Sequence, residues 1–79
     1  MTPIPTNDQL RALRSVEQSS TGIDAVSDRD CGLDCVYHGW LRHREHRREE
    51  GGVIDVWELT AEGRRKVEYA GEFHREKAA

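Results

Sequence analysis

The segment that most constrains the fold of this chain is Trp57–Arg65, with the sequence WELTAEGRR. Trp57 and Leu59 alternate with polar residues, as they do in a strand with one buried face. Thr60 follows at once and is suited to cap a helix whose first turn contains Glu62. The segment therefore predicts a strand that runs directly into a C-terminal helix, over about residues 61–77.

Residues 42–56 predict a two-stranded hairpin whose second strand continues through Trp57 and Leu59 into the C-terminal helix. We call this hairpin the wing. Its first half, Arg42–Arg48, is rich in arginine and histidine. Gly51 and Gly52 permit positive φ angles at a reversal, and β-branched residues then return in Val53–Val56. The four arginines of the hairpin are called the wing arginines below: Arg42, Arg44, Arg47 and Arg48.

Apolar residues at helical spacing predict three helices before the wing. Thr6 or Asn7 is suited to cap the first helix. Its apolar stripe consists of Leu10, Leu13 and Val16. Small hydroxylated residues and a glycine break the pattern over residues 19–22. A second helix is expected to begin near Ile23, and a third is expected over about 28–38, or over 33–41 if it starts after Gly32.

Length and composition indicate one small globular domain. The chain has 79 residues, of which 35% are hydrophobic and 34% charged, so the core is expected to be thin. We expect a flexible arm over residues 1–6 and a single domain over residues 7–79. No apolar run approaches the roughly 20 residues that cross a bilayer, and the N-terminus lacks the pattern of a secretory signal. These features predict a cytoplasmic protein with no membrane partner and with reduced thiols.

Positive charge is concentrated in the wing. The whole chain carries a formal net charge of −3, which argues against a uniformly basic nucleic-acid-binding surface. The wing arginines nevertheless make residues 39–52 the one stretch with a positive balance, flanked by acidic stretches. Arginine suits forked hydrogen bonding to phosphate, and a G+C-rich genome would also favour arginine over lysine. Local charge therefore points to the wing as the nucleic-acid contact.

The frame formed by Gly39-Trp40-Leu41, the basic hairpin and Trp57-x-Leu59-Thr60-x-x-Gly63 resembles the winged helix-turn-helix domain of small bacterial and archaeal transcription regulators of the MarR-like and PadR-like kind. The resemblance covers roughly residues 7–70. It implies an α+β fold with three N-terminal helices, a two-stranded wing hairpin and a C-terminal helix, in which the threonine caps the last helix and the glycine lets it pack closely. It also implies a regulator that binds double-stranded DNA as a two-fold dimer.

The resemblance implies that the helix over residues 28–38 lies in the major groove. That helix carries three aspartates and one arginine, and carboxylates repel phosphates. Its candidate donors are Arg29, Tyr37 and His38. We therefore expect the wing arginines to supply most of the affinity. The face of the last helix that carries Tyr69 and Phe73 is expected to pair with a second copy of the chain.

Three other functions compete with DNA binding. The acidic helix and the net negative charge favour a winged-helix adaptor that binds protein. A zinc-binding module would use thiolates and imidazoles as ligands, although their spacing matches no usual zinc motif; the candidates are Cys31, Cys35, His38, His43 and His46. An enzyme is the weakest alternative, because the chain has no phosphate loop and no nucleophile elbow. We predict no catalytic residues, no resident metal and no cofactor.

Overall fold

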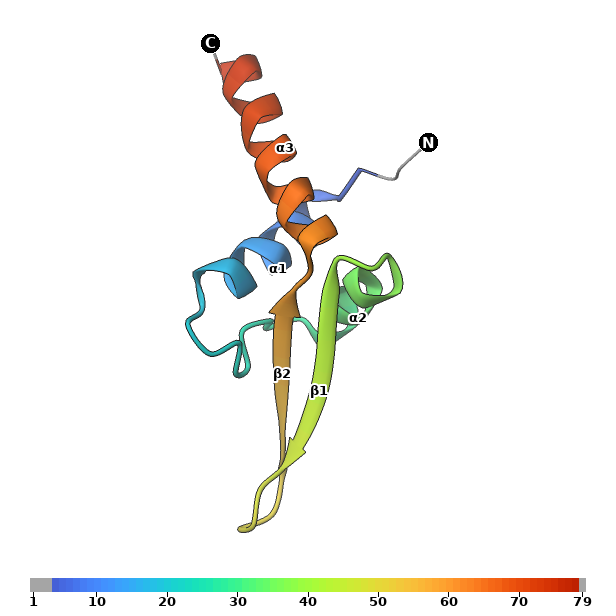
Figure 1. Cartoon of the computed structure of the whole chain (residues 1–79), viewed down its shortest axis with the longest axis vertical. Helices are drawn as coiled ribbons and strands as arrows, with labels where there is room; N and C mark the ends of the chain where they lie inside the picture. Colours follow the sequence, from blue (N-terminus) through green and yellow to red (C-terminus); the bar gives the residue numbers. More distant parts are fainter. Residues whose placement is uncertain (1–3, 79) are drawn as a thin grey trace.

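The computed structural model describes residues 4–78 of the chain, with side chains to residue 69. The elements follow in the order α1 (Asn7–Gln18), α2 (Arg29–Tyr37), β1 (Leu41–Arg47), β2 (Val53–Leu59) and α3 (Ala61–Ala78). Figure 1 shows that α1, α2 and the start of α3 gather around the root of the β1–β2 hairpin, which projects from this body. The described residues therefore form a small α+β fold with three helices and one antiparallel hairpin.

The first helix begins and packs as its sequence predicts. The Thr6 side chain accepts a hydrogen bond from the backbone N–H of Gln9, and the Gln9 side chain accepts one from the backbone N–H of Thr6. This reciprocal pair satisfies two donors that a helix start leaves free. The apolar stripe is buried, as expected, at Leu10, Leu13 and Val16. Gln9 is also buried and donates from Nε2 to Asp34 at 3.0 Å, which ties α1 to α2.

The helix predicted near Ile23 is absent, so two helices precede the hairpin within residues 4–40 instead of the predicted three. Ile23 instead forms an isolated antiparallel bridge with Val56 of β2. Backbone hydrogen bonds from Asp24 to Asp55 and from Trp57 to Gly22 flank the bridge. Gly22 has a φ of +75°, and a Cβ there would lie 2.0 Å from the Trp57 carbonyl oxygen. Pairing with β2 thus outweighs the apolar spacing that favours a helix. Downstream of this segment, α2 matches the expected 28–38 helix.

The two tryptophans lie at the centre of the core. Trp40 is 1% exposed and Trp57 is 2% exposed, and they pack with Leu13, Leu41 and Cys35. Apart from Trp40, which directly precedes β1, these side chains come from α1, α2 and both strands, so the root of the hairpin is itself part of the core. The burial of Trp57, which the alternation of its strand predicts, is confirmed.

Thr60 and Gly63 join the start of α3 to the chain before β1. The Thr60 hydroxyl donates to the Gly39 carbonyl at 2.7 Å and accepts from the Gly63 backbone N–H at 3.0 Å. The Thr60 backbone N–H donates to the Trp40 carbonyl at 3.1 Å. A Cβ at Gly63 would lie 2.0 Å from that same carbonyl oxygen. The predicted cap and the predicted close approach of glycine are both confirmed.

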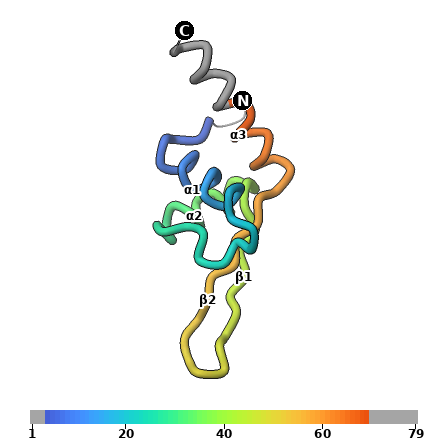
Figure 2. The backbone as a smooth tube through the Cα atoms, turned by 90° about the vertical axis from the view of Figure 1, so that its left-hand side faces the viewer, coloured from blue at the N-terminus to red at the C-terminus, as the bar shows by residue number. Residues whose placement is uncertain are grey.

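The hairpin is regular, and its register pairs Leu41 with Leu59 and Arg47 with Val53. Its turn uses Gly51 and Gly52, whose φ angles are +97° and +92°. The tube in Figure 2 shows the two strands leaving the helices as an extended finger. The predicted two-stranded hairpin with a glycine turn is confirmed.

The last helix covers the predicted range of about 61–77, and Val67 on its inner side is buried. Tyr69 is 60% exposed. The side chains of Phe73 and His74, which the sequence assigns to the same helix, lie outside the described residues. The predicted arm over residues 1–6 also lies partly outside them. No helix in the described part of the chain combines the length and the apolar character that a bilayer span needs.

Candidate nucleic-acid interface

The wing arginines are all exposed, and they occupy two places on the hairpin. Arg42 and Arg44 stand opposite Glu58 and Val56, on the outer face that turns away from the core. Arg47 ends β1, and Arg48 begins the turn, where its backbone N–H donates to the Gly52 carbonyl. Within residues 4–69, the ion pairs of the structure involve none of the four. Their guanidinium groups are therefore open to an external anion.

The outer half of the hairpin stands clear of the helices. The body meets β2 through the bridge of Ile23 with Val56 and the bond from Asp24 to Asp55. From His46 through Val53 the side chains are exposed. At about 3.3 Å per residue, this free part extends some 10 Å beyond the last body contact. A projecting finger of this kind can follow a polymer surface that the body does not touch.

An open groove runs beside the inner half of β1, between the hairpin and the end of α2. Val36 of α2 lines it together with Arg42 and Arg44 of β1. The full lining is Val36, Leu41, Arg42, His43, Arg44, Val56 and Glu58. Two guanidinium groups thus border a concave surface that also has an apolar wall.

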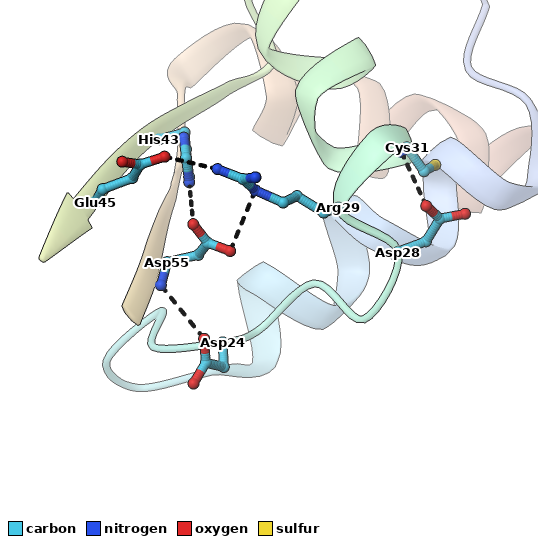
Figure 3. Close-up of polar contacts among 7 residues, drawn as sticks. All are labelled: Asp24, Asp28, Arg29, Cys31, His43, Glu45 and Asp55. Carbon is cyan, nitrogen blue, oxygen red and sulfur yellow. Dashed lines mark hydrogen bonds and ion pairs between the residues drawn. The ribbon is translucent and has the colours of Figure 1, made fainter. Parts of the chain in front are cut away.

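Arg29 is placed differently from the wing arginines, because its guanidinium group lies between two carboxylates of the hairpin (Figure 3). Its Nη2 atom lies 2.6 Å from Oε1 of Glu45, and its Nε atom lies 3.5 Å from Oδ2 of Asp55. The sequence predicts Arg29 as a DNA contact. In the structure, its ion pairs join the start of α2 to both strands, and its contact with DNA stays a prediction.

Asp55 is the centre of a group of five residues that we call the Asp55 cluster, namely Asp24, Arg29, His43, Glu45 and Asp55. Nε2 of His43 lies 2.8 Å from Oδ1 of Asp55, which accepts a hydrogen bond from the ring. The same ring packs on Trp57, with centroids 4.3 Å apart. The backbone N–H of Asp55 donates to Asp24. The cluster therefore connects α2, the bridge segment and both strands at the point where the hairpin leaves the body (Figure 3).

Sequence reasoning did not foresee this cluster. Strand alternation does place His43 with Glu45 on one face of β1, and Asp55 with Trp57 on one face of β2. What it leaves out is which of these faces meets α2. A basic residue at a helix start together with acidic residues at the middle of a hairpin is a signal too weak to select this pairing.

Tyr37 and His38, the other donors predicted on α2, lie at its end. Tyr37 is 85% exposed. The His38 ring stacks on Trp40 with centroids 4.5 Å apart and meets the Tyr37 ring edge-on. Tyr37 is thus free to reach an external partner, whereas His38 is held against the core.

The outward face of α2 is acidic with an apolar centre. Leu33 is 38% exposed and lies four residues before Tyr37, on the same side of the helix. Asp30 lies on that side too, three residues before Leu33, and so does Asp34, four residues after Asp30. Asp28 caps this helix by accepting from the Cys31 backbone N–H. The helix that the resemblance assigns to the major groove therefore presents carboxylates and apolar carbons to solvent.

The two cysteines are reduced and face the body of the protein. Burial, together with the nearby Cys31 and Asp34, raises the pKa of the Cys35 thiol to about 12. Burial and the carboxylates of Asp28 and Asp8 also raise the pKa of Cys31. Raised pKa values disfavour the thiolate that binds zinc. Across the described residues, no three His, Cys, Asp or Glu side chains gather around a point that could hold a metal ion.

Comparisons of the chain with protein-family models, with curated proteins and with solved structures find no match in any of the three. The class of the protein therefore rests on its own residues. It is a small α+β protein whose layout of helices and hairpin is compatible with a winged helix.

Proposed function

We propose that this protein is a small DNA-binding transcription regulator of the winged-helix kind, with the wing arginines on the phosphate backbone and α2 at the major groove. One observation carries the proposal. Four exposed guanidinium groups lie along a projecting hairpin and have no carboxylate partner within the described residues. An extended anionic polymer is the partner that such an arrangement fits best.

The strength of this electrostatic contact depends on how many phosphates the wing arginines neutralise. Each phosphate neutralised on duplex DNA adds about −0.9 to the slope of log affinity against log salt. Four wing arginines therefore predict a slope of about −3.6, which is a loss of roughly 150-fold between 50 and 200 mM salt. Arginine adds geometry to charge, because its fork donates two parallel hydrogen bonds to one phosphate.

The part of α2 in the proposal is limited by its charge. Asp30 and Asp34 repel phosphate, so the helix adds little to affinity. A carboxylate can nevertheless accept from the exocyclic amine of cytosine, and the exposed Tyr37 hydroxyl can donate to a base or a phosphate. We therefore assign affinity to the wing and assign to α2 whatever sequence preference exists. The proposal includes a homodimer through α3, for which the exposed Tyr69 is a candidate contact.

The test measures binding of a labelled DNA duplex by fluorescence anisotropy between 50 and 200 mM salt. The native protein is compared with a variant in which all four wing arginines are alanine. That variant should melt within a few degrees of the native protein, because these side chains are exposed. It should also lose most of the salt slope. A quadruple variant that binds as the native protein does would show that the wing is not the contact.

A matched pair of variants separates position from net charge. Arg42→Ala/Arg44→Ala and Arg11→Ala/Arg14→Ala each remove two exposed positive charges, from the hairpin and from α1 respectively. The hairpin variant should reduce the slope by about 1.8, and the α1 variant should leave it nearly unchanged. Equal losses would indicate attraction by overall charge and would refute a specific wing contact.

A second candidate function is an adaptor that binds protein, and the outward face of α2 favours it. Leu33 and Tyr37 offer an apolar centre, and Asp30 and Asp34 frame it with negative charge. A basic helix or strand of a partner protein would complement this face. Duplex binding that is absent at 50 mM salt, or that does not change with salt, would select the adaptor over the regulator.

A further inference from the structure

We infer that Glu45 occupies the place of a nucleic-acid phosphate on Arg29, so that Arg29 is a fifth phosphate contact that the free protein masks. This inference rests on the proposed function, because it concerns the same interface. The sequence alone predicts that Arg29 contacts DNA directly and indicates no other group bound to it in the free protein. The structure assigns it a bound carboxylate that must leave first.

The two carboxylates on Arg29 differ in how firmly they are held. Asp55 is 24% exposed in its side chain and also accepts from the His43 ring at 2.8 Å. Glu45 is 56% exposed, and its side chain has no bonding partner other than Arg29 among the described residues. Exposed ion pairs are weak and are screened by salt. Glu45 is therefore the carboxylate that can exchange, while Asp55 keeps the guanidinium group in place.

A phosphodiester is a suitable replacement for Glu45. It carries the same single negative charge as a carboxylate and presents two oxygens to the fork of an arginine. The exchange leaves the charge around Arg29 unchanged and releases the Glu45 side chain into solvent. Since Asp55 contacts Nε, the terminal nitrogens of the guanidinium group remain available to the incoming oxygens.

The position of Glu45 on the hairpin supports the exchange. Glu45 and Arg47 lie on the same face of β1, two residues apart, which is a separation of about 6.6 Å along a strand. A phosphate backbone that contacts Arg47 therefore passes close to Glu45. Glu45 lies where the free part of the hairpin begins, so a polymer that follows the wing toward the body meets it before it meets Arg29 (Figure 3).

The ion pair between Glu45 and Arg29 determines which complexes use the fifth contact. The native protein must displace Glu45 to gain the fifth contact, so a loosely docked duplex uses the wing arginines alone. A duplex seated against the start of α2 gains Arg29 as well. Removing the charge of Glu45 should make the fifth contact available in every complex.

The test compares Glu45→Gln with Glu50→Gln in the duplex assay. Each substitution removes one exposed carboxylate from the hairpin, but Glu50 lies in the turn and makes no ion pair within the described residues. Glu45→Gln should steepen the salt slope by about 0.9 relative to Glu50→Gln. Between 50 and 200 mM salt, the affinity of Glu45→Gln for the duplex should therefore decrease by a factor about 3.5 times larger than that of Glu50→Gln.

An Arg29→Gln background supplies the second measurement. With Arg29 removed, Glu45→Gln and Glu50→Gln should have equal slopes, and the melting curve of each variant confirms that it is folded. Equal slopes in the native background would overturn the inference while leaving the wing contact intact. A native protein without salt-dependent binding would overturn the proposed function and this inference together.

Discussion

The substitution Gly63→Ala separates the effect of helix propensity from that of tertiary contact, because the two predict changes of opposite sign in the free energy of unfolding. Gly63 lies in the first turn of α3, where replacing glycine with alanine normally stabilises a helix by up to about 1 kcal/mol. The structure predicts a loss of stability instead. A Cβ at this position would lie 2.0 Å from the Trp40 carbonyl oxygen and 2.9 Å from the carbon bonded to it. Backbone atoms cannot rotate away as a flexible side chain can, so α3 or the Trp40 backbone must move.

Three hydrogen bonds depend on that close approach. They join the Thr60 N–H to Trp40, the Thr60 hydroxyl to Gly39, and the Gly63 N–H to the Thr60 hydroxyl, at 3.1, 2.7 and 3.0 Å. At about 1 kcal/mol each, their loss costs about 3 kcal/mol. After the gain in propensity, the expected net destabilisation is about 2 kcal/mol. That is a large part of the roughly 4–12 kcal/mol expected for a chain of this length.

The assay is urea unfolding followed by tryptophan fluorescence, since both tryptophans are buried. Glu68→Gly on the exposed side of the same helix calibrates propensity alone and should cost about 1 kcal/mol. If Gly63→Ala is as stable as the native protein, or more stable, then α3 does not pack on the Trp40 backbone as described, and the reasoning is refuted.

Two further predictions concern α1 and the buried thiol. Gln9→Ala removes the bonds to Thr6 and Asp34 and should cost about 1–3 kcal/mol in urea unfolding, whereas Gln18→Ala, which is exposed, should be nearly neutral; equal effects would contradict the assigned contacts. For Cys35, the folded protein keeps the proton up to a pKa of about 12, while the unfolded chain releases it near the ordinary value of 9.0. The stability that this thiol contributes is therefore fully present below pH 9 and is lost as pH rises from 9 toward 12. The urea midpoint should decrease between about pH 8 and about pH 11, and this decrease should be smaller for Cys35→Ala than for the native protein. Equal decreases in the two proteins would contradict the raised pKa.

Local signals predicted most of the elements. The cap at Thr6, the spacing of Leu10 and Leu13, and the glycine pair at the turn each act within a few residues, and the tertiary packing agrees with each of them. The Leu59–Thr60 step into α3 belongs to the same class. Each of these expectations is confirmed by the contacts that the structure shows.

The segment after α1 was predicted wrongly because its partner lies far along the chain. Ile23 and Val26 have helical spacing, yet Ile23 pairs with Val56 and Gly22 accepts a bond from Trp57. A backbone hydrogen bond to a strand more than thirty residues away is not encoded in local periodicity. Tertiary pairing therefore decided a secondary-structure element.

The candidate site divides in the same way. Exposure of the wing arginines follows from their own positions in a basic, poorly apolar strand, so the sequence alone determined it. The pairing of Arg29 with Glu45 and Asp55 required α2 to dock against one face of the hairpin. That docking depends on the fit of Gly32 and Val26 around the Trp57 ring. Charges along a chain are set by sequence, whereas the charges that meet are set by packing, because an ion pair depends on distance in space.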